Sequence, residues 1–167
     1  MSAEYEIIID DQALMEALKD PHLVAEPVRE FLTKGALEIE GESKELAVVD
    51  TGRMRNSIQT RLGQLEARVG PTVHYAPHVE FGTRPHWAPV GALQPWASRH
   101  GFGQGKRGDA FVRAIIARRG TKSHPFMRPG LAAAKPAIEG HLRTLGTQIQ
   151  ANFDAHARGS AAAGDSG

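Results

Sequence analysis

The chain has 167 residues, of which 41% are hydrophobic and 23% charged, and its formal net charge is +1. These values are typical of one globular domain and exclude collagen-like, wholly disordered and coiled-coil classes. The chain has no cysteine, which excludes thiol nucleophiles, thiolate metal sites and disulfides. The start, MSAEYEIIIDD, holds too short an apolar run for a signal peptide or a membrane span. We therefore expect a soluble protein made in the cytoplasm, with no membrane partner.

The small net charge hides a strong asymmetry along the chain. Residues 1–50 carry 13 acidic and 4 basic side chains, whereas residues 51–167 carry 6 acidic and 16 basic ones. Within residues 99–128 the basic side chains are opposed by Asp109 alone. This basic stretch is a solvated surface, a face for nucleic-acid phosphates, or a face for the acidic half of a neighbouring copy.

Hydrophobic spacing predicts helices towards both ends of the chain. Within residues 11–46, apolar side chains recur every three or four positions, and Pro21 and Pro27 are expected to divide a short helix from a long one. From Pro129 onward a second apolar stripe predicts a long helix, which Pro136 should bend.

The last residues of the chain differ from the rest in composition. Residues 158–167 are almost entirely glycine, alanine and serine, a low-complexity composition that favours disorder. We therefore expect a single domain over residues 1–157, followed by a tail over residues 158–167.

Two short strands are predicted between the helical regions. Residues 58–62 and 65–69 alternate apolar and polar side chains on either side of Gly63 and Gln64. This is the pattern of a β-hairpin, so we expect a small antiparallel sheet.

A long loop is expected after the hairpin. Residues 85–108 are rich in glycine, proline, tryptophan and histidine and have no sustained period. Such a length is unusual for a structureless connection, so the segment is either functional or holds a short helix near residues 95–99. Residues 110–119 have helical spacing, and Gly120 is expected to end that helix.

The triplet Asp50-Thr51-Gly52 is the first candidate for chemistry. Aspartic proteases use this triplet in pairs, with two carboxylates sharing one proton, so a single copy would require a homodimer. Arg53 would place a cation beside the carboxylates and oppose proton sharing. The alternative is a turn in which Asp50 or Thr51 accepts backbone N–H groups. We predict no catalytic residue and keep the dimeric protease as the minor alternative.

Histidines and glycines give no convincing site for a metal or a cofactor. His74 and His78 are four residues apart with Glu80 nearby, which is metal-ligand spacing on a helix, but Pro77 lies between them. Residues 101–106 lack the strand-to-helix setting of a phosphate-binding loop. We therefore predict no metal ion and no cofactor.

Four motifs occur in the order found in the tail-component family of lambdoid phages, and they occupy residues 50–58, 69–71, 75–83 and 124–129. The chain resembles this family over roughly residues 11–153. Family members are described as tail-completion, neck or minor tail proteins of long-tailed phages and prophages. Met54 and His78 stand where leucine and tyrosine are usual, and the insertion at residues 85–119 is longer than in minimal members.

The resemblance implies an α+β protomer, with an N-terminal helix and a long C-terminal helix packed on a small antiparallel β-sheet. It implies a non-enzymatic virion protein that forms a homo-oligomeric ring, sixfold in symmetry, at the head-to-tail joint. The implied partners are a head connector or adaptor and a tail terminator or tail tube protein, with at most passive contact to packaged DNA. The ring would be assembled in the host cytoplasm. The alternative is a nucleic-acid-binding module that uses residues 99–128.

Residues of the shared motifs are expected to have structural roles. Tyr75 and Phe81 would anchor the short element between them in the core, and Gly82 would permit a sharp exit. The other motif residues to which we give a structural role are Asp50, Thr51, Gly52, Pro125, Phe126 and Pro129.

Charged and aromatic side chains outside the core are the expected interface. Arg53 and Arg55 would pair with Glu80 or with acidic groups of a neighbour, and Arg128 would cap or bridge at the last helix. The tryptophans of the long loop are either core residues or interface anchors. The residues expected at an interface are Arg53, Arg55, Glu80, Trp87, Trp96, Arg113, Arg118, Arg119 and Arg128.

Overall fold

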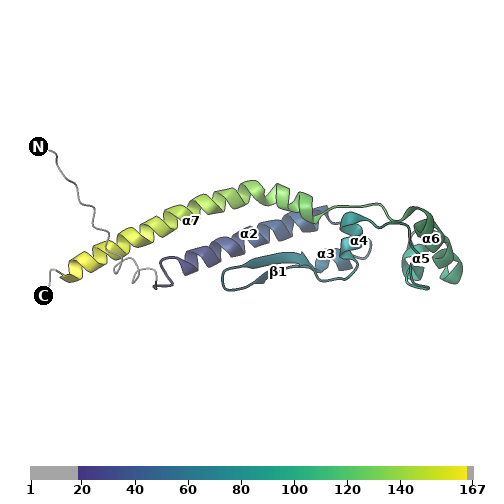
Figure 1. The fold of residues 1–167 in the computed structure, drawn as a ribbon, viewed down its shortest axis with the longest axis horizontal. Coiled ribbons are helices and arrows are strands. Elements are labelled where there is room, and N and C mark those ends of the chain that lie inside the picture. Colours follow the sequence, from purple (N-terminus) through teal and green to yellow (C-terminus); the bar gives the residue numbers. More distant parts are fainter. Residues whose placement is uncertain (1–18, 165–167) are drawn as a thin grey trace, which may run out of the picture. The chain divides into compact units, whose positions relative to one another are not determined.

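The computed structural model describes residues 19–164. In chain order they form α2 (Ala25–Leu46), α3 (Arg53–Asn56), β1 (Ile58–Leu62), β2 (Ala67–Pro71), α4 (Ala76–Phe81), α5 (Gln94–Arg99), α6 (Gly105–Arg119) and α7 (Met127–Gly164). The two strands pair in one small sheet, so the fold class is α+β, as the resemblance implied (Figure 1). The short helix expected to begin near residue 11 falls mostly outside the described residues.

Each of the two long helices contains a proline, one in the first turn and one in the interior. Pro27 is in the first turn of α2, where an N–H group has no partner within the helix, so the missing proton costs no hydrogen bond. Pro136 lies inside α7, and the helix nevertheless continues through it to Gly164.

The chain divides into two compact units, and each long helix contributes to both. The first unit holds residues 60–69 and 133–164 together with the described residues up to Ile39. The second unit holds residues 40–59 and 70–132. The prediction of a single domain over residues 1–157 remains a prediction.

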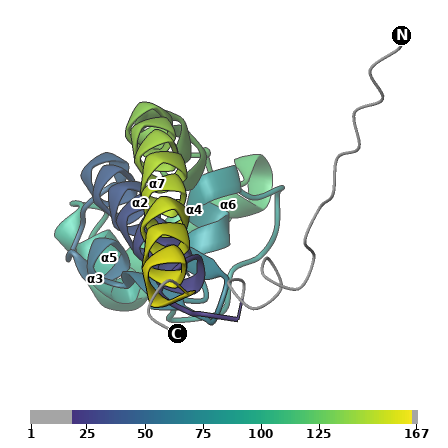
Figure 2. The same cartoon turned by 90° about the vertical axis from the view of Figure 1, so that its left-hand side faces the viewer.

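In the first unit, α2 and α7 lie side by side (Figures 1 and 2). Gly35 of α2 faces Ile138 of α7, where an added Cβ would lie 3.6 Å from the Ile138 side chain. Further along, Asn152 Nδ2 donates a hydrogen bond to the His22 carbonyl oxygen at 3.0 Å. The hairpin joins this pair through Thr60, whose hydroxyl donates to the Ala36 carbonyl at 3.5 Å.

The second unit has a core built from several short elements. Ile58 and Phe126 are its largest fully buried side chains, and Met54 and Val112 are also buried. Because the elements are short, small residues such as Ala97 complete the packing between α5 and α6.

One close crossing in the second unit joins the end of α2 to the start of α7. A Cβ on Gly130 would lie 2.8 Å from both the backbone nitrogen and the Cα of Ser43, so only glycine fits there. Ser43 is fully buried, and its hydroxyl has no hydrogen-bond partner in the part of the chain that the structure describes. The crossing is therefore tight and carries one uncompensated polar group.

A second close approach joins two loops of the same unit. Thr83 and Thr121 form an antiparallel bridge, in which each backbone N–H donates to the other residue's carbonyl oxygen, with nitrogen-to-oxygen distances of 3.1 and 3.2 Å. Gly82 and Gly120 precede these threonines with φ angles of 70° and 71°, which L side chains rarely adopt. Gly82 thus permits the sharp exit from α4 that the sequence predicted.

Three boundaries differ from the predicted ones. β2 is Ala67–Pro71 rather than 65–69, because the turn is closed by a bond from Gly63 N–H to the Glu66 carbonyl. α6 begins at Gly105 rather than at residue 110, since its glycine-rich and basic first turn lacks apolar spacing. α7 extends through residues 158–164, which the sequence assigned to the low-complexity tail, and the disorder of that tail stays a prediction.

Candidate functional site

The carboxylate of Asp50 is held by two basic side chains that follow it by about fifty residues. Arg99 donates to it through Nε at 3.0 Å and through a second guanidinium nitrogen, and His100 Nε2 lies 3.3 Å away. Hydrogen bonding from Arg99 holds the pKa of Asp50 below its ordinary value. The cation beside Asp50 is thus Arg99, and not the Arg53 that the sequence indicated. An ionised carboxylate of this kind is unsuited to sharing a proton in a protease dyad.

The rest of the triplet forms a turn. Gly52 has a φ of 77° and precedes α3, whose Met54 is buried. The Thr51 hydroxyl accepts the Arg53 N–H at 3.5 Å. This is the turn geometry that was the alternative to a protease site.

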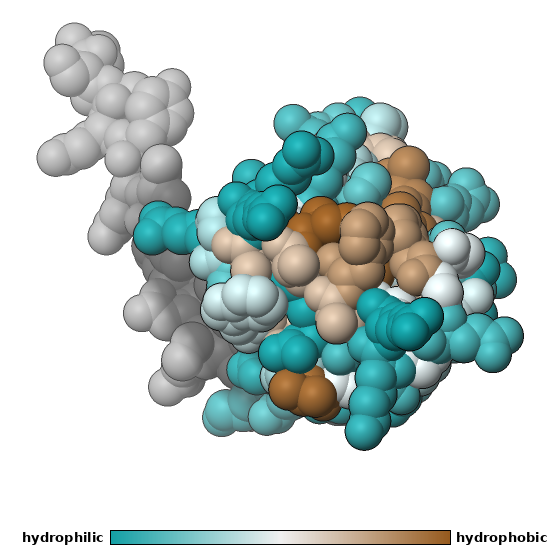
Figure 3. Space-filling model, turned by 90° about the vertical axis from the view of Figure 1, so that its right-hand side faces the viewer, coloured by the Kyte–Doolittle hydropathy of each residue, from teal (hydrophilic) through white to brown (hydrophobic). Residues whose placement is uncertain are grey.

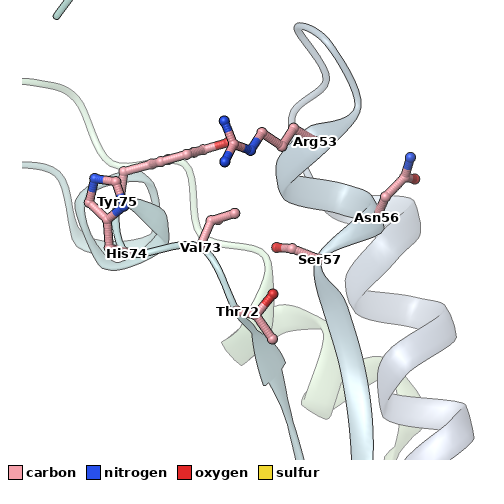
Figure 4. A pocket seen from close by; sticks show the side chains of 7 residues that line it. All are labelled: Arg53, Asn56, Ser57, Thr72, Val73, His74 and Tyr75. Carbon is pink, nitrogen blue, oxygen red and sulfur yellow. The ribbon is translucent and has the colours of Figure 1, made fainter.

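An open depression lies beside α3. Its volume is about 610 Å³, and it is lined by Arg53, Asn56, Ser57, Thr72, Val73, His74 and Tyr75. Figure 4 shows the Tyr75 side chain extending toward Arg53, with its hydroxyl near the guanidinium. The depression is shallow and mainly polar, so it offers a surface to a partner rather than an enclosed site for a small substrate.

Glu80 is buried and caps the long C-terminal helix. Its carboxylate accepts hydrogen bonds from the backbone N–H groups of Phe126, Met127 and Arg128 at 2.7, 3.0 and 3.2 Å. Burial alone would raise the pKa of Glu80, but the three backbone donors outweigh it and hold the pKa below its ordinary value. The predicted ion pair of Glu80 with Arg53 or Arg55 is therefore wrong, because these donors already occupy the carboxylate.

The start of α7 carries a second contact that the sequence did not indicate. The Arg128 guanidinium lies over the ring of Phe81, 5.0 Å from its centroid, in a cation–π contact. Phe81 is 61% exposed, so the prediction that it anchors the core is wrong, and the fully buried aromatic side chain is that of Phe126. Tyr75 is half-buried, so its exposure lies between that of Phe81 and that of Phe126.

Two charged residues of the basic stretch act inside the second unit. Asp109 is buried and accepts the backbone N–H groups of Gly91 and Leu93 at 3.0 and 3.1 Å. Arg113 donates to the Ala88 carbonyl at 2.7 Å, and its charge lies 3.9 Å from Asp109. Sequence reasoning missed the role of Asp109, although its isolation among basic residues was the available signal.

The two tryptophans of the long loop have different environments. Trp96 is half-buried in α5, where its ring stacks on His100 at 4.3 Å and on Phe102 at 5.5 Å between centroids. Trp87 is 69% exposed and lies 5.7 Å from the Arg113 guanidinium. Trp96 thus helps to build the unit, whereas most of the Trp87 surface stays open to a partner.

Other basic side chains of the stretch point to solvent. Figure 3 shows apolar surface bordered by hydrophilic side chains on the side of the molecule that carries α5 and α6. Large hydrophobic residues exposed in this region are Trp87, Val90, Phe102, Phe111 and Ile115. Exposed basic residues that accompany them in the sequence are Lys106, Arg107, Arg118, Arg119 and Lys122. A basic, aromatic surface of this composition is typical of a protein interface.

Residues 19–164 contain no cluster of three histidine, aspartate or glutamate side chains arranged to hold a metal ion. None of the helices described there combines the length and apolar character needed to cross a bilayer.

Comparison with known proteins gives one match. Residues 12–82 match the model of the family described as "Bacteriophage HK97-gp10, putative tail-component". The matched segment contains α2, α3, both strands and α4, and with them the first three sequence motifs up to Gly82. No curated protein and no solved structure was found to match the chain. Over residues 12–82 the comparison thus confirms what the motifs indicated, that this chain is similar to a family of phage tail components.

Proposed function

We propose that this chain is a structural protein of the head-to-tail joint of a long-tailed phage. In this proposal, copies of the chain form a homo-oligomeric ring, sixfold in symmetry, between the head connector or adaptor and the tail terminator or tail tube. The observation that carries the proposal is the match of residues 12–82 to a phage tail component. The protein would act in the neck of the virion, by contact rather than by turnover of a substrate.

The surface of the second unit supports a role in assembly. Soluble monomers rarely expose several large apolar side chains together, and such patches mark contacts with other proteins. Here α6 and the loop before α5 expose Trp87, Val90 and Phe111 beside basic residues. A joint protein needs surfaces of this kind, because it must contact both its own copies and the proteins on either side.

The state of the one catalytic candidate favours the same conclusion. Asp50 is engaged by Arg99 and His100 and is held ionised, so its carboxylate has a structural use in the turn before α3. The depression near it is open and polar. Neither feature offers the buried, water-excluding pocket that proton-sharing carboxylates require.

The proposal is tested by removing the protein from the phage that encodes it. A lysate without the chain should contain filled heads and complete tails that are not joined, because only the joint is missing. Adding the purified full-length chain to this lysate should restore infectious particles. Joined, infectious particles in the absence of the protein would contradict the proposal.

Nucleic-acid binding is the second candidate, and exposed Arg107, Arg118, Arg119 and Lys122 favour it. Three other basic residues of the stretch are already engaged inside the chain, namely Arg99, Arg113 and Arg128. A neck that releases DNA should contact it only passively. Tight, salt-sensitive binding of a short DNA duplex by the purified chain would favour this candidate over the joint protein.

A further inference from the structure

The second unit carries two exposed apolar surfaces of opposite charge. The acidic surface lies at the end of α2 and just after it, and comprises the half-buried Glu42 and the exposed Glu45, Leu46, Val48 and Val49. The basic surface lies on α6 and comprises Arg107, Phe111, Ile115 and Arg118. The large apolar side chains of both surfaces are between 37% and 56% exposed.

The basic surface is one continuous face of α6. At 100° per residue, its four side chains fall within a sector of about 80° on the helix. Asp109 on the opposite side of the helix and Val112 on its flank are buried in the unit. Phe111 is fixed from one side by Phe102, with 5.9 Å between ring centroids. Among the described residues, neither Arg107 nor Arg118 has a hydrogen-bond or ion-pair partner.

The acidic surface is held in place by the turn that follows it. Glu42 and Leu46 are four residues apart and so share one side of α2. Val48 and Val49 come directly before Asp50, whose contacts with Arg99 fix this segment on the unit. In the described part of the chain, Glu42 and Glu45 make no ion pair with any basic side chain.

The two surfaces complement each other but do not meet within one copy, since the large apolar side chains of both remain exposed. Each offers two free charges of one sign beside two or three large apolar side chains. We propose that the acidic surface of one copy binds the basic surface of the next copy, head to tail. This inference rests on the proposed ring, because a contact between two different surfaces can close around an axis only when it repeats from copy to copy.

A second copy fits these surfaces better than nucleic acid does. Phosphates would pair with Arg107 and Arg118 but would leave Phe111 and Ile115 without apolar contacts. Nucleic acid would also be repelled by Glu42 and Glu45. A second copy satisfies both charges and both apolar sets in one contact.

The native chain contains no cysteine, so single cysteines can report the contact directly. Val49→Cys and Phe111→Cys should each remain uncrosslinked when treated alone with a short bis-maleimide. A mixture of the two variants should give a crosslinked dimer, and the double variant should give a ladder that ends at the size of the ring. Leu142→Cys, an equally exposed position on α7, should give no dimer with Phe111→Cys.

Each alternative outcome of the crosslinking experiment overturns the inference. No crosslink between Val49→Cys and Phe111→Cys would show that the surfaces do not meet. Efficient crosslinking of either single variant alone would indicate a symmetric contact instead of a head-to-tail one.

Charge exchange gives a second test that does not depend on crosslinking geometry. The variants Glu42→Lys/Glu45→Lys and Arg107→Glu/Arg118→Glu should each associate at least about tenfold more weakly than the native chain, because like charges then face each other. An equal mixture should assemble again, since each variant restores the partner that the other needs. Glu139→Lys/Arg143→Glu on α7 is the matched control and should assemble like the native chain. Circular dichroism checks that every variant is folded.

The outcomes separate this inference from the proposed function. If both charge variants still form a ring as readily as the native chain, the inference is contradicted but the proposed role at the joint is not. A contact that forms as described, in a protein that fails to join heads to tails, contradicts the joint role alone. Loss of DNA duplex binding in Arg107→Glu/Arg118→Glu, without any effect on association, would assign α6 to nucleic acid and overturn the inference.

Discussion

At the scale of single residues, the second unit depends on places where only one residue type fits. Gly130 allows α7 to cross the backbone of Ser43, and Gly82 and Gly120 allow two loops to pair through Thr83 and Thr121. These positions contribute little buried area. They matter because any side chain there would push two backbone segments apart.

Replacing Gly130 with alanine should destabilise the protein by about 2 kcal/mol, because the new Cβ would overlap the Ser43 backbone. Gly140 lies in the same helix with nothing within 4 Å of an added Cβ, so Gly140→Ala is the control and should stabilise by about 0.5 to 1 kcal/mol. Chemical denaturation measures both. Equal effects of the two substitutions would contradict the close crossing.

Replacing Ser43 with alanine should stabilise the protein by about 1 kcal/mol, because it removes a buried hydroxyl that has no partner in the described chain. The control is Ser57→Ala, which should destabilise, since the Ser57 hydroxyl donates to the Met54 carbonyl at 2.7 Å. Thermal unfolding measures the stability of both variants relative to the native chain. Destabilisation by Ser43→Ala would mean that its hydroxyl is satisfied.

These single-residue features could be predicted from the sequence only in part. A glycine after Phe81 indicates a sharp turn whatever the rest of the fold, and Gly82 has that role. Nothing near Gly130 in the sequence indicates that Ser43 packs against it, because the two are 87 positions apart. For the same reason, nothing in the sequence identifies Arg99 as the partner of Asp50, whereas Arg53 is the cation that lies near Asp50 in the sequence.

At the scale of elements, Glu80 connects α4 to the start of α7. Its buried carboxylate accepts three N–H groups from the first residues of the helix region, where backbone donors have no partner within a helix. A negative charge at this end also interacts favourably with the helix dipole. The position of the long helix therefore depends on one ionised side chain.

The protein should lose this contribution in acid. The pKa of Glu80 is lower in the folded chain than its ordinary value of 4.5, so the stabilisation is complete above that value. It is lost as the pH falls below 4.5 and through the lower pKa of the folded state. Glu80→Gln should cost about 2 kcal/mol at neutral pH, and the difference from the native chain should shrink in acid.

Urea denaturation at several pH values measures this dependence. Glu139→Gln, at an exposed position of α7, is the control and should follow the native chain at every pH. A cost for Glu80→Gln that stays constant from neutral pH down through the acidic range would contradict the role of the charge.

Strongly periodic elements can be predicted from the sequence, and elements that depend on distant contacts cannot. The hairpin and the two long helices follow from local spacing and turn residues, whereas α5 is only one of two alternatives for a segment without a sustained period. The first turn of α6 has no apolar spacing, and it forms where Asp109 binds the loop at Gly91 and Leu93. The α4 helix is likewise only six residues long, too short to show a period.

At the scale of the whole molecule, the sequence asymmetry of charge leads to two complementary surfaces. Not every charge takes part, because several pair within a copy, as in Arg99 with Asp50 and Lys34 with Glu30. The free charges that remain include Glu42 and Glu45 on one side and Arg107 and Arg118 on the other. Composition alone could suggest this polarity, but only the fold identifies which charges are already used.

Association of the purified chain should therefore weaken as salt is raised. Exposed charge pairs are screened over a Debye length of about 8 Å at physiological ionic strength and about 3 Å at 1 M. Apolar contact through Phe111 and Val49 should leave some association at high salt. Sedimentation velocity across a salt series measures the effect, and association that strengthens with salt would indicate a purely apolar contact.

The most direct measurement is a cryo-electron microscopy reconstruction of the intact particle at the joint between head and tail. It should contain a ring of copies of this chain there, with α6 of each copy against the end of α2 in the next. A joint without this protein, or copies that do not touch one another, would contradict the central claim that the chain works by assembling between head and tail.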